Sequence, residues 1–285
     1  MPRVSCQPTT VTSGIVTRVS TERGLRGWFG AFWAGAGAHM HIPAGNPARE
    51  RVLPTGPAHL VIRLAGAPLR LYDTELDGSG RPIGHCLVGG PREAAYLRAL
   101  DPGSDSVGVE LLPGTVSALF GVPAWQLAGA HWSLTDLWGT DASRLRERLL
   151  ETRDVHRRIE LLEQALLGRL QSARSLHPAV AFGLAELAAG SGVSTVVRET
   201  GYSHRRFLSL FRDAVGLTPR TWSRVQRFRR AVAGLHADAG PASVAAAEFT
   251  DQPHLTREFR RNAGITPARY RELKSGHPNH VPVRG

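Results

Sequence analysis

The clearest hydrophobic pattern along the chain lies in the stretch GYSHRRFLSLFRDAVGLTP, residues 201–219. Its apolar side chains Phe207, Leu210, Phe211 and Val215 recur every three or four residues and therefore share one side of a helix. The other side is polar, and its first turn is almost purely cationic. The pattern predicts a helix that packs on a core along one face and presents positive charge on the other.

The first half of the chain has a different pattern, in which short apolar runs alternate with Gly, Pro and Asp turn signals. Such alternation favours antiparallel strands, and the runs lie at residues 59–64, 68–76, 84–90 and 106–114. Short helical turns are expected over residues 116–139, followed by two helices that Asp141 and Asp154 would cap. The second of these helices has an apolar stripe that is either core or a dimer seam. The stripe consists of Val155, Ile159, Leu162, Leu166 and Leu170.

The polar and apolar pattern of residues 201–219 occurs twice. A shift of 48 residues places Ser203 on Asp251 and Gly216 on Gly264, and it aligns GLTPRTW with GITPARY. An internal repeat indicates one supersecondary unit used twice. In each copy a Ser or Asp caps the cationic helix, a Gly ends it, and a Thr-Pro pair starts the next helix. We therefore predict two helix-turn-helix units, over residues 193–214 and 243–262, joined by a linker helix over Pro219 to Leu235.

In a helix-turn-helix unit the N-terminal end of the second helix enters the major groove. Base contacts are expected in the first unit from His204, Arg205, Arg206 and Ser209. In the second unit they are expected from Gln252, Pro253, His254, Thr256 and Arg257. Arginine binds guanine bidentately and glutamine binds adenine, so both sets are equipped to read sequence. Three arginines further along these helices are better suited to phosphates, namely Arg212, Arg260 and Arg261.

Two features near these helices leave questions open. The linker helix carries arginines that either contact DNA or form a solvated face, and these are Arg224, Arg227, Arg229 and Arg230. In the second unit, Glu248 stands where glycine is expected before the turn, and Glu258 replaces the apolar residue that corresponds to Leu210. We therefore expect a distorted turn in the second unit, and for this unit mainly phosphate anchoring is the alternative to base reading.

The positive charge of the chain is unevenly distributed. The formal net charge is +11, and the residues from 174 onward hold 17 Lys and Arg against 8 Asp and Glu, whereas residues 1–173 hold 18 against 16. This distribution favours a polyanionic partner for the C-terminal part; the alternative is a cationic domain that is merely well solvated. No stretch approaches the roughly 20 apolar residues that a membrane helix needs, and no signal peptide is evident. We expect a cytoplasmic, nucleoid-associated protein without a membrane partner.

The motifs TGYSHRRFLSLFRDAVGLTPRTW and FTDQPHLTREFRRNAGITPARYR make residues 178–273 resemble the DNA-binding domain of the AraC/XylS family of bacterial transcription regulators. The resemblance implies a monomeric domain whose two helix-turn-helix units read adjacent major grooves. RERVLPTGPAHLVIRL and FGVPAWQLAGAHWSLTDLWG resemble the N-terminal domains of actinobacterial members. That resemblance implies a small β-rich module for sensing or dimerisation.

The expected fold class is α+β, with a β-rich, cupin-like N-terminal domain followed by an all-α C-terminal domain. We predict the sensing domain over residues 1–140, a helical segment and linker over 141–177, and the DNA-binding domain over 178–275. A flexible tail is expected over 276–285.

The predicted function is sequence-specific transcription regulation, with the double-stranded DNA of a promoter as partner and with neither catalysis nor a cofactor. The N-terminal domain is expected to bind a small-molecule effector or a second copy of the chain. RNA polymerase is a further partner if the protein is an activator.

Two other functions compete with this one. A metal-dependent cupin-type enzyme with an appended DNA-binding domain is suggested by His39 and His41, but Glu50 lies too far along for a cupin ligand set, so structural histidines are favoured. Sequence-blind packaging of nucleic acid is the third reading, and the two dissimilar reading helices argue against it.

Overall fold

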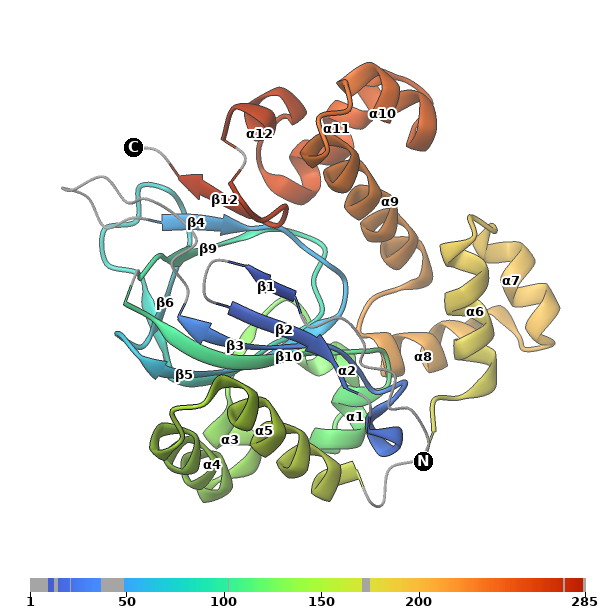
Figure 1. Ribbon diagram of the computed structural model, residues 1–285. Helices are drawn as coiled ribbons and strands as arrows, with labels where there is room; N and C mark the ends of the chain where they lie inside the picture. The colour runs from blue at the N-terminus through green and yellow to red at the C-terminus, as the bar shows by residue number, and fades with distance from the viewer. Residues whose placement is uncertain are drawn as a thin grey trace, which may run out of the picture.

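The computed structural model describes residues 10–12, 15–20, 22–36, 49–101, 103–170, 175–273 and 275–283. Over these residues a domain of two antiparallel sheets is followed by helices that form two helix-turn-helix units (Figure 1). The predicted α+β class, with the β-rich part first, is confirmed. His39 and His41 lie outside the described residues, as does part of the predicted linker, residues 171–174.

The larger sheet has the strand order β1-β2-β3-β10-β5-β8-β11. Its strands are β1 (Thr10–Thr12), β2 (Ile15–Val19), β3 (Phe29–Ala36), β5 (Ala58–Ala65), β8 (Cys86–Gly89), β10 (Asp105–Leu111) and β11 (His131–Ser133). Three of the predicted strands fall on β5, β8 and β10. The sequence pattern missed β3, because glycine and alanine dilute its alternation. Phe32 and Ala34 nevertheless point into the core, opposite Val109 and Val107 of β10.

The smaller sheet contains the C-terminal strand. Its order is β12-β4-β9-β6-β7, with β12 (His280–Val283), β4 (Arg49–Val52), β9 (Tyr96–Ala99), β6 (Leu69–Tyr72) and β7 (Arg81–Gly84). The expectation of a flexible tail over 276–285 is therefore wrong for residues 280–283. Strand β12 pairs with β4, whose outer edge would otherwise leave backbone N–H and C=O groups unpaired. Val281 is buried in the same cluster as Leu53, so the pairing also adds apolar contact.

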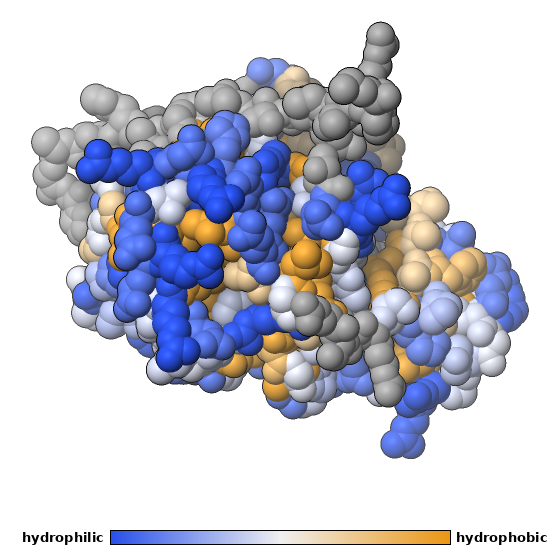
Figure 2. All heavy atoms as spheres, turned by 60° about the horizontal axis from the view of Figure 1, so that its bottom comes forward, coloured by the Kyte–Doolittle hydropathy of each residue, from blue (hydrophilic) through white to orange (hydrophobic). Residues whose placement is uncertain are grey.

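Helices cover the larger sheet and share its core. They are α1 (Thr115–Phe120), α2 (Ala124–Leu127), α3 (Leu134–Trp138), α4 (Thr140–Glu151) and α5 (Val155–Leu170), with a short 3-10 helix at Arg23–Leu25. The apolar stripe of α5 packs against β3 and β10, so it is core and not an exposed seam. The face of the molecule that carries α4 and α5 shows hydrophilic side chains with apolar areas between them (Figure 2).

The two predicted caps in this region have different outcomes. Asp154 accepts a hydrogen bond of 2.7 Å from the backbone N–H of Arg157 and caps α5, as expected. Asp141 does not cap α4, because Gly139 occupies the N-cap position. Asp141 lies instead in the first turn, where a negative charge suits the helix dipole, and its carboxylate pairs with Arg169 at 2.7 Å.

The C-terminal region is helical up to residue 273. Its helices are α6 (Pro178–Ala188), α7 (Val193–Thr200), α8 (His204–Val215), α9 (Pro219–His236), α10 (Pro241–Glu248), α11 (Gln252–Ala263) and α12 (Pro267–Leu273). In Figure 1, α9 runs from the end of α8 to the start of α10. Trp222 and Val225 of α9 belong to the core of the first unit, whereas Phe228, Val232 and Leu235 belong to the core of the second. One helix is therefore anchored in both cores. Within the described residues, no helix is long and apolar enough to cross a bilayer.

Candidate nucleic-acid interface

The two candidate recognition helices, α8 and α11, begin in the same way. The side chain of Ser203 accepts from the backbone N–H of Arg206 at 3.3 Å, and that of Asp251 accepts from His254 at 2.6 Å. Each cap satisfies a backbone donor that would otherwise have no partner in the first turn.

The helices also end in the same way. Gly216 and Gly264 adopt the left-handed conformation, with φ of 84° and 73°, which favours glycine. Thr218 and Thr266 then cap α9 and α12, accepting from backbone N–H groups at 3.2 and 3.1 Å. The sequence repeat therefore corresponds to a structural repeat, with the same caps and the same helix ends in both units.

One side of α8 is exposed to solvent from its first turn onward. His204, Arg205, Arg206 and Ser209 are exposed, and the opposite side of the helix buries Phe207, Phe211 and Val215. The predicted base-reading residues of the first unit thus lie together on one exposed surface. Since only the first turn of a recognition helix reaches deep into a groove, this surface is suited to that contact.

The far end of α8 contacts the β-rich domain. The guanidinium carbon of Arg212 lies 4.9 Å from the ring centroid of Trp125, and Trp125 Nε1 donates to Asp213 at 3.1 Å. Arg212 was predicted to bind phosphate; it is exposed, yet it stacks on this tryptophan. Gly216 packs so closely that a Cβ would lie 2.7 Å from Pro91 and 3.0 Å from the carbonyl oxygen of Ala124.

In α11 the predicted residues divide between two surfaces. Gln252, Pro253, Arg257 and Arg260 are exposed, and Thr256 is half-buried with its hydroxyl donating to the Gln252 carbonyl at 3.0 Å. His254 and Arg261 lie on a different side and line a cavity shared with α9. The ring of His254 packs edge-on against Phe249 at 5.5 Å.

The two turns that precede the recognition helices differ, as expected from Glu248. In the first unit Gly201 ends α7 in the left-handed conformation, with φ of 71°. In the second unit Phe249 ends α10 in an extended conformation, with φ of −135°. Both oxygens of Glu248 accept from Arg230 Nε at 2.8 Å, and Glu258 Oε2 lies 3.7 Å from Arg224 Nε. Both departures from the repeat therefore place a carboxylate against an arginine of α9.

Sequence reasoning left open whether the α9 arginines face DNA or solvent, and several have protein partners instead. Arg224 is paired with Glu93 and lies near Glu258, Arg230 binds Glu248, and Arg229 donates to Gln226 at 3.1 Å. Arg224 is only 12% exposed. Part of the positive charge on α9 therefore forms ion pairs within the protein.

The segment between β8 and β9 attaches α11 to the β-rich domain. Asn262 is buried, and its side-chain Nδ2 donates to the backbone carbonyl of Glu93 at 2.6 Å. The backbone carbonyl of Asn262 accepts from the backbone N–H of Ala95 at 2.7 Å. Sequence reasoning missed Asn262, because a lone asparagine on a helix carries no pattern that distinguishes it.

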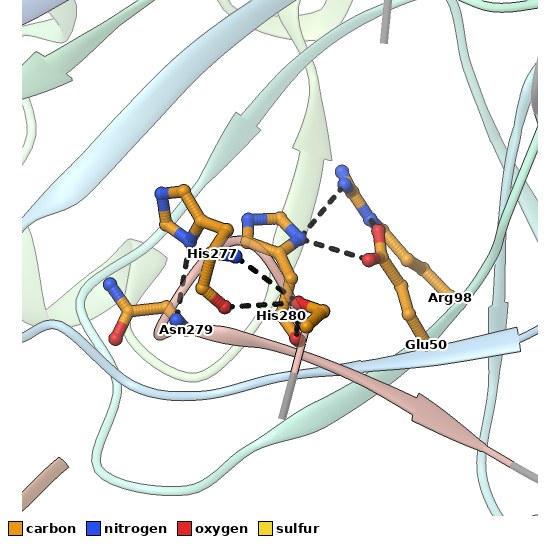
Figure 3. Close-up of polar contacts among 6 residues, drawn as sticks. Glu50, Arg98, His277, Asn279 and His280 are labelled. Carbon is orange, nitrogen blue, oxygen red and sulfur yellow. Dashed lines mark hydrogen bonds and ion pairs between the residues drawn. The ribbon is translucent and has the colours of Figure 1, made fainter. Parts of the chain in front are cut away.

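A second attachment lies where β12 meets β4. Glu50 is 1% exposed and binds both Arg98 and His280, whose Nδ1 lies 3.0 Å from Glu50 Oε2 (Figure 3). Ser275 accepts from His277 and donates to the His280 carbonyl at 2.6 Å, which holds the turn before β12. Burial alone would raise the pKa of Glu50, but the charges of Arg98 and His280 and their hydrogen bonds outweigh it and hold that pKa well below its usual value. Glu50 therefore acts as a buried anion that ties three strands together.

Two histidines inside the β-rich domain are held neutral. Burial, assisted by the charge of Arg92, lowers the pKa of His59 to about 3, and the same causes lower the pKa of His131. Arg92 lies 3.2 Å from His131 Nδ1 and stacks on Tyr96 at 4.2 Å. These side chains form a polar cluster around the Arg92 guanidinium. Among the described residues, no three His, Cys, Asp or Glu side chains are grouped in a way that could hold a metal ion.

Comparison with known families gives one match in each half of the chain. Residues 196–273 match the model of a helix-turn-helix domain, and residues 18–133 match that of a domain of unknown function, DUF6597. The search of curated proteins gave no match. The helix-turn-helix match extends from within α7 through α12 and so includes both candidate recognition helices.

Some solved structures of regulators are similar at low sequence identity. ToxT from Vibrio cholerae O395 shows 11% identity and a TM-score of 0.43, covering 81% of this chain and 97% of that chain. Unsaturated fatty acid-bound wild-type ToxT from V. cholerae strain SCE256 shows 11% identity and a TM-score of 0.43, covering 83% and 99%. The C-terminal domain of AraT, a response regulator from Geobacillus stearothermophilus, shows 15% identity and a TM-score of 0.33, covering 35% and 89%.

The resemblance seen in the sequence motifs is thus confirmed by the family match, which rests on the same residues as the repeated units. The protein is a DNA-binding transcription regulator with an AraC-type helix-turn-helix domain at its C-terminal end.

Proposed function

We propose that the protein regulates transcription by binding a specific DNA sequence, with α8 and α11 entering adjacent major grooves of one duplex. The residues that read bases are those of the two exposed first turns, led by Arg205 and Arg206 in α8 and by Gln252 and Arg257 in α11. The β-rich domain modulates this binding through a small-molecule effector or through a second copy of the chain. No catalytic step is proposed.

The observation that carries this proposal is the pair of equivalent helices held by one rigid connector. Helix α9 has 18 residues, which corresponds to a length of about 27 Å at about 1.5 Å per residue. Successive major grooves on one side of a duplex are about 34 Å apart. A connector of this length, buried in the cores of both units, supports simultaneous entry into neighbouring grooves.

Contacts between the β-rich domain and both units support the modulating role. Trp125 touches α8, Glu93 pairs with Arg224 of α9, and the segment before β9 holds Asn262 of α11. A conformational change in the β-rich domain would therefore reach both reading helices through these direct side-chain contacts. A ligand produces such a change only if it binds one conformation more tightly than the other.

Arg260→Ala tests the division between phosphate contacts and base contacts. Arg260 is exposed beyond the first turn of α11, so its loss should weaken binding to a selected site and to random duplex by a similar factor of about ten. The slope of log K against log salt concentration should fall by about one. Fluorescence anisotropy at a series of salt concentrations measures both quantities.

Arg144→Ala is the matched control, since it removes one exposed arginine from α4 in the β-rich domain. An Arg260→Ala protein with the salt slope of the control would contradict the phosphate role.

A further inference from the structure

A polar cavity of about 500 Å³ lies between α9 and α11. Its lining comes from one side of each helix, namely Arg220, Arg224 and Arg227 of α9 and His254, Glu258 and Arg261 of α11. In both helices the spacing is four and then three residues, which places the side chains on one stripe. Four arginines thus surround the cavity with one carboxylate in the lining.

Two of these arginines each have one buried N–H donor that lacks an acceptor. Among the described residues, the buried Nε atoms of Arg224 and Arg227 have no hydrogen-bond partner, and Glu258 Oε2 approaches Arg224 Nε only to 3.7 Å. A buried donor without an acceptor carries a cost of about 1–3 kcal/mol, more for a charged group. An oxyanion that enters the cavity would supply acceptors, and a guanidinium binds phosphate oxygens bidentately.

Two of the lining arginines contact a carboxylate of the other domain, that of Glu93. Glu93, in the segment between β8 and β9, binds Arg224 through Oε2, and Arg261 Nη2 lies 3.9 Å from the same oxygen. The Glu93 side chain is 44% exposed, so solvent and solutes reach it. Glu93 brings one negative charge to two of the lining arginines. A phosphate group in the cavity would bring two negative charges and could contact more of the four arginines.

We propose that this cavity is a phosphate-binding site and that Glu93 is the internal anion that a bound phosphate displaces. Glu93 belongs to the β-rich domain, and its partners Arg224 and Arg261 belong to the DNA-binding domain. Phosphate binding therefore removes a side-chain link between the two domains at the second unit. The phosphate is carried either by a free phosphorylated molecule or by the DNA backbone, and only the second case rests on the proposed function.

The first arm of the test uses pyrophosphate and the full chain without DNA. Isothermal titration calorimetry should show binding to wild type, about tenfold weaker binding to Arg220→Gln and to Arg227→Gln, and about tenfold tighter binding to Glu93→Gln. Arg220 is exposed and Arg227 Nε has no hydrogen-bond partner among the described residues, so both changes leave the other side-chain hydrogen bonds of the fold in place. Arg144→Gln, which removes an exposed arginine from α4, should bind as wild type does.

The second arm uses random duplex DNA at a series of salt concentrations. If the phosphate comes from the backbone, Arg220→Gln and Arg227→Gln should each lower the salt slope by about one, and Glu93→Gln should tighten binding several-fold. The proposal is overturned if the cavity variants equal Arg144→Gln in both arms. Pyrophosphate binding that depends on the cavity arginines, in a protein that shows no preference for any DNA, would support this site and refute the proposed function.

Discussion

Replacing Arg206 by alanine is expected to weaken binding to the cognate duplex by about ten- to a hundredfold, and binding to random duplex by much less. Arg206 lies in the exposed first turn of α8, and its backbone N–H donates to the Ser203 cap. A bidentate contact between arginine and guanine contributes about 1–3 kcal/mol of discrimination against the wrong base. The Arg206→Ala change should therefore lower mainly the ratio of the affinity for the cognate duplex to the affinity for random duplex.

The measurement compares wild type with Arg206→Ala on two duplexes, one selected from a random library by the wild-type protein and one of scrambled sequence. Arg144→Ala again controls for the loss of one positive charge. An equal loss on both duplexes would make Arg206 a phosphate anchor. Equal affinity of the wild type for both duplexes would instead favour sequence-blind packaging.

The second large effect concerns the fold, where Glu50→Gln should lower the free energy of unfolding by about 3 kcal/mol. Glu50 is buried against Arg98 and His280, and removal of one member of a buried ion pair typically costs about 3–5 kcal/mol, because the remaining charge loses its partner. Glutamine preserves the volume of the side chain, so the change isolates the charge. Denaturation in urea at pH 7 measures the difference.

The same variant has a defined pH dependence. The pKa of Glu50 is lower in the folded chain than in the unfolded chain, where a glutamate titrates near about 4.3. Its ionisation therefore stabilises the fold fully above about pH 5, and the stabilisation is lost as the pH falls toward the folded pKa. The gap between wild type and Glu50→Gln should shrink between about pH 5 and pH 3. A gap that stays constant over this range would show that the carboxylate charge is not what stabilises the junction of β4 and β12.

Features that depend on neighbouring residues were predictable from the sequence. The caps at Ser203 and Asp251, the left-handed Gly216 and Gly264, and the buried stripe of α9 all follow from residues within a turn of one another. The same local rules failed at Asp141, where Gly139 takes the cap position, because several nearby residues compete for a helix start.

Contacts between distant segments were not predictable in this way. Glu93 and Arg224 are 131 residues apart, Asn262 and Glu93 are 169 apart, and His280 and Glu50 are 230 apart. A single chain without periodicity at these positions carries no signal that pairs them. The residues proposed to read DNA therefore follow from the sequence pattern and stay a prediction, whereas the contacts that connect their helices to the β-rich domain required the fold.

The central claim is that both recognition helices enter the major groove of one duplex, about one helical turn apart. Methylation interference with dimethyl sulfate tests it directly, because the reagent modifies guanine N7 in the major groove. The full-length wild-type protein should show two clusters of interfering guanines on a selected duplex, with centres about 10 base pairs apart. A single cluster, or interference spread evenly along the duplex, would contradict paired recognition.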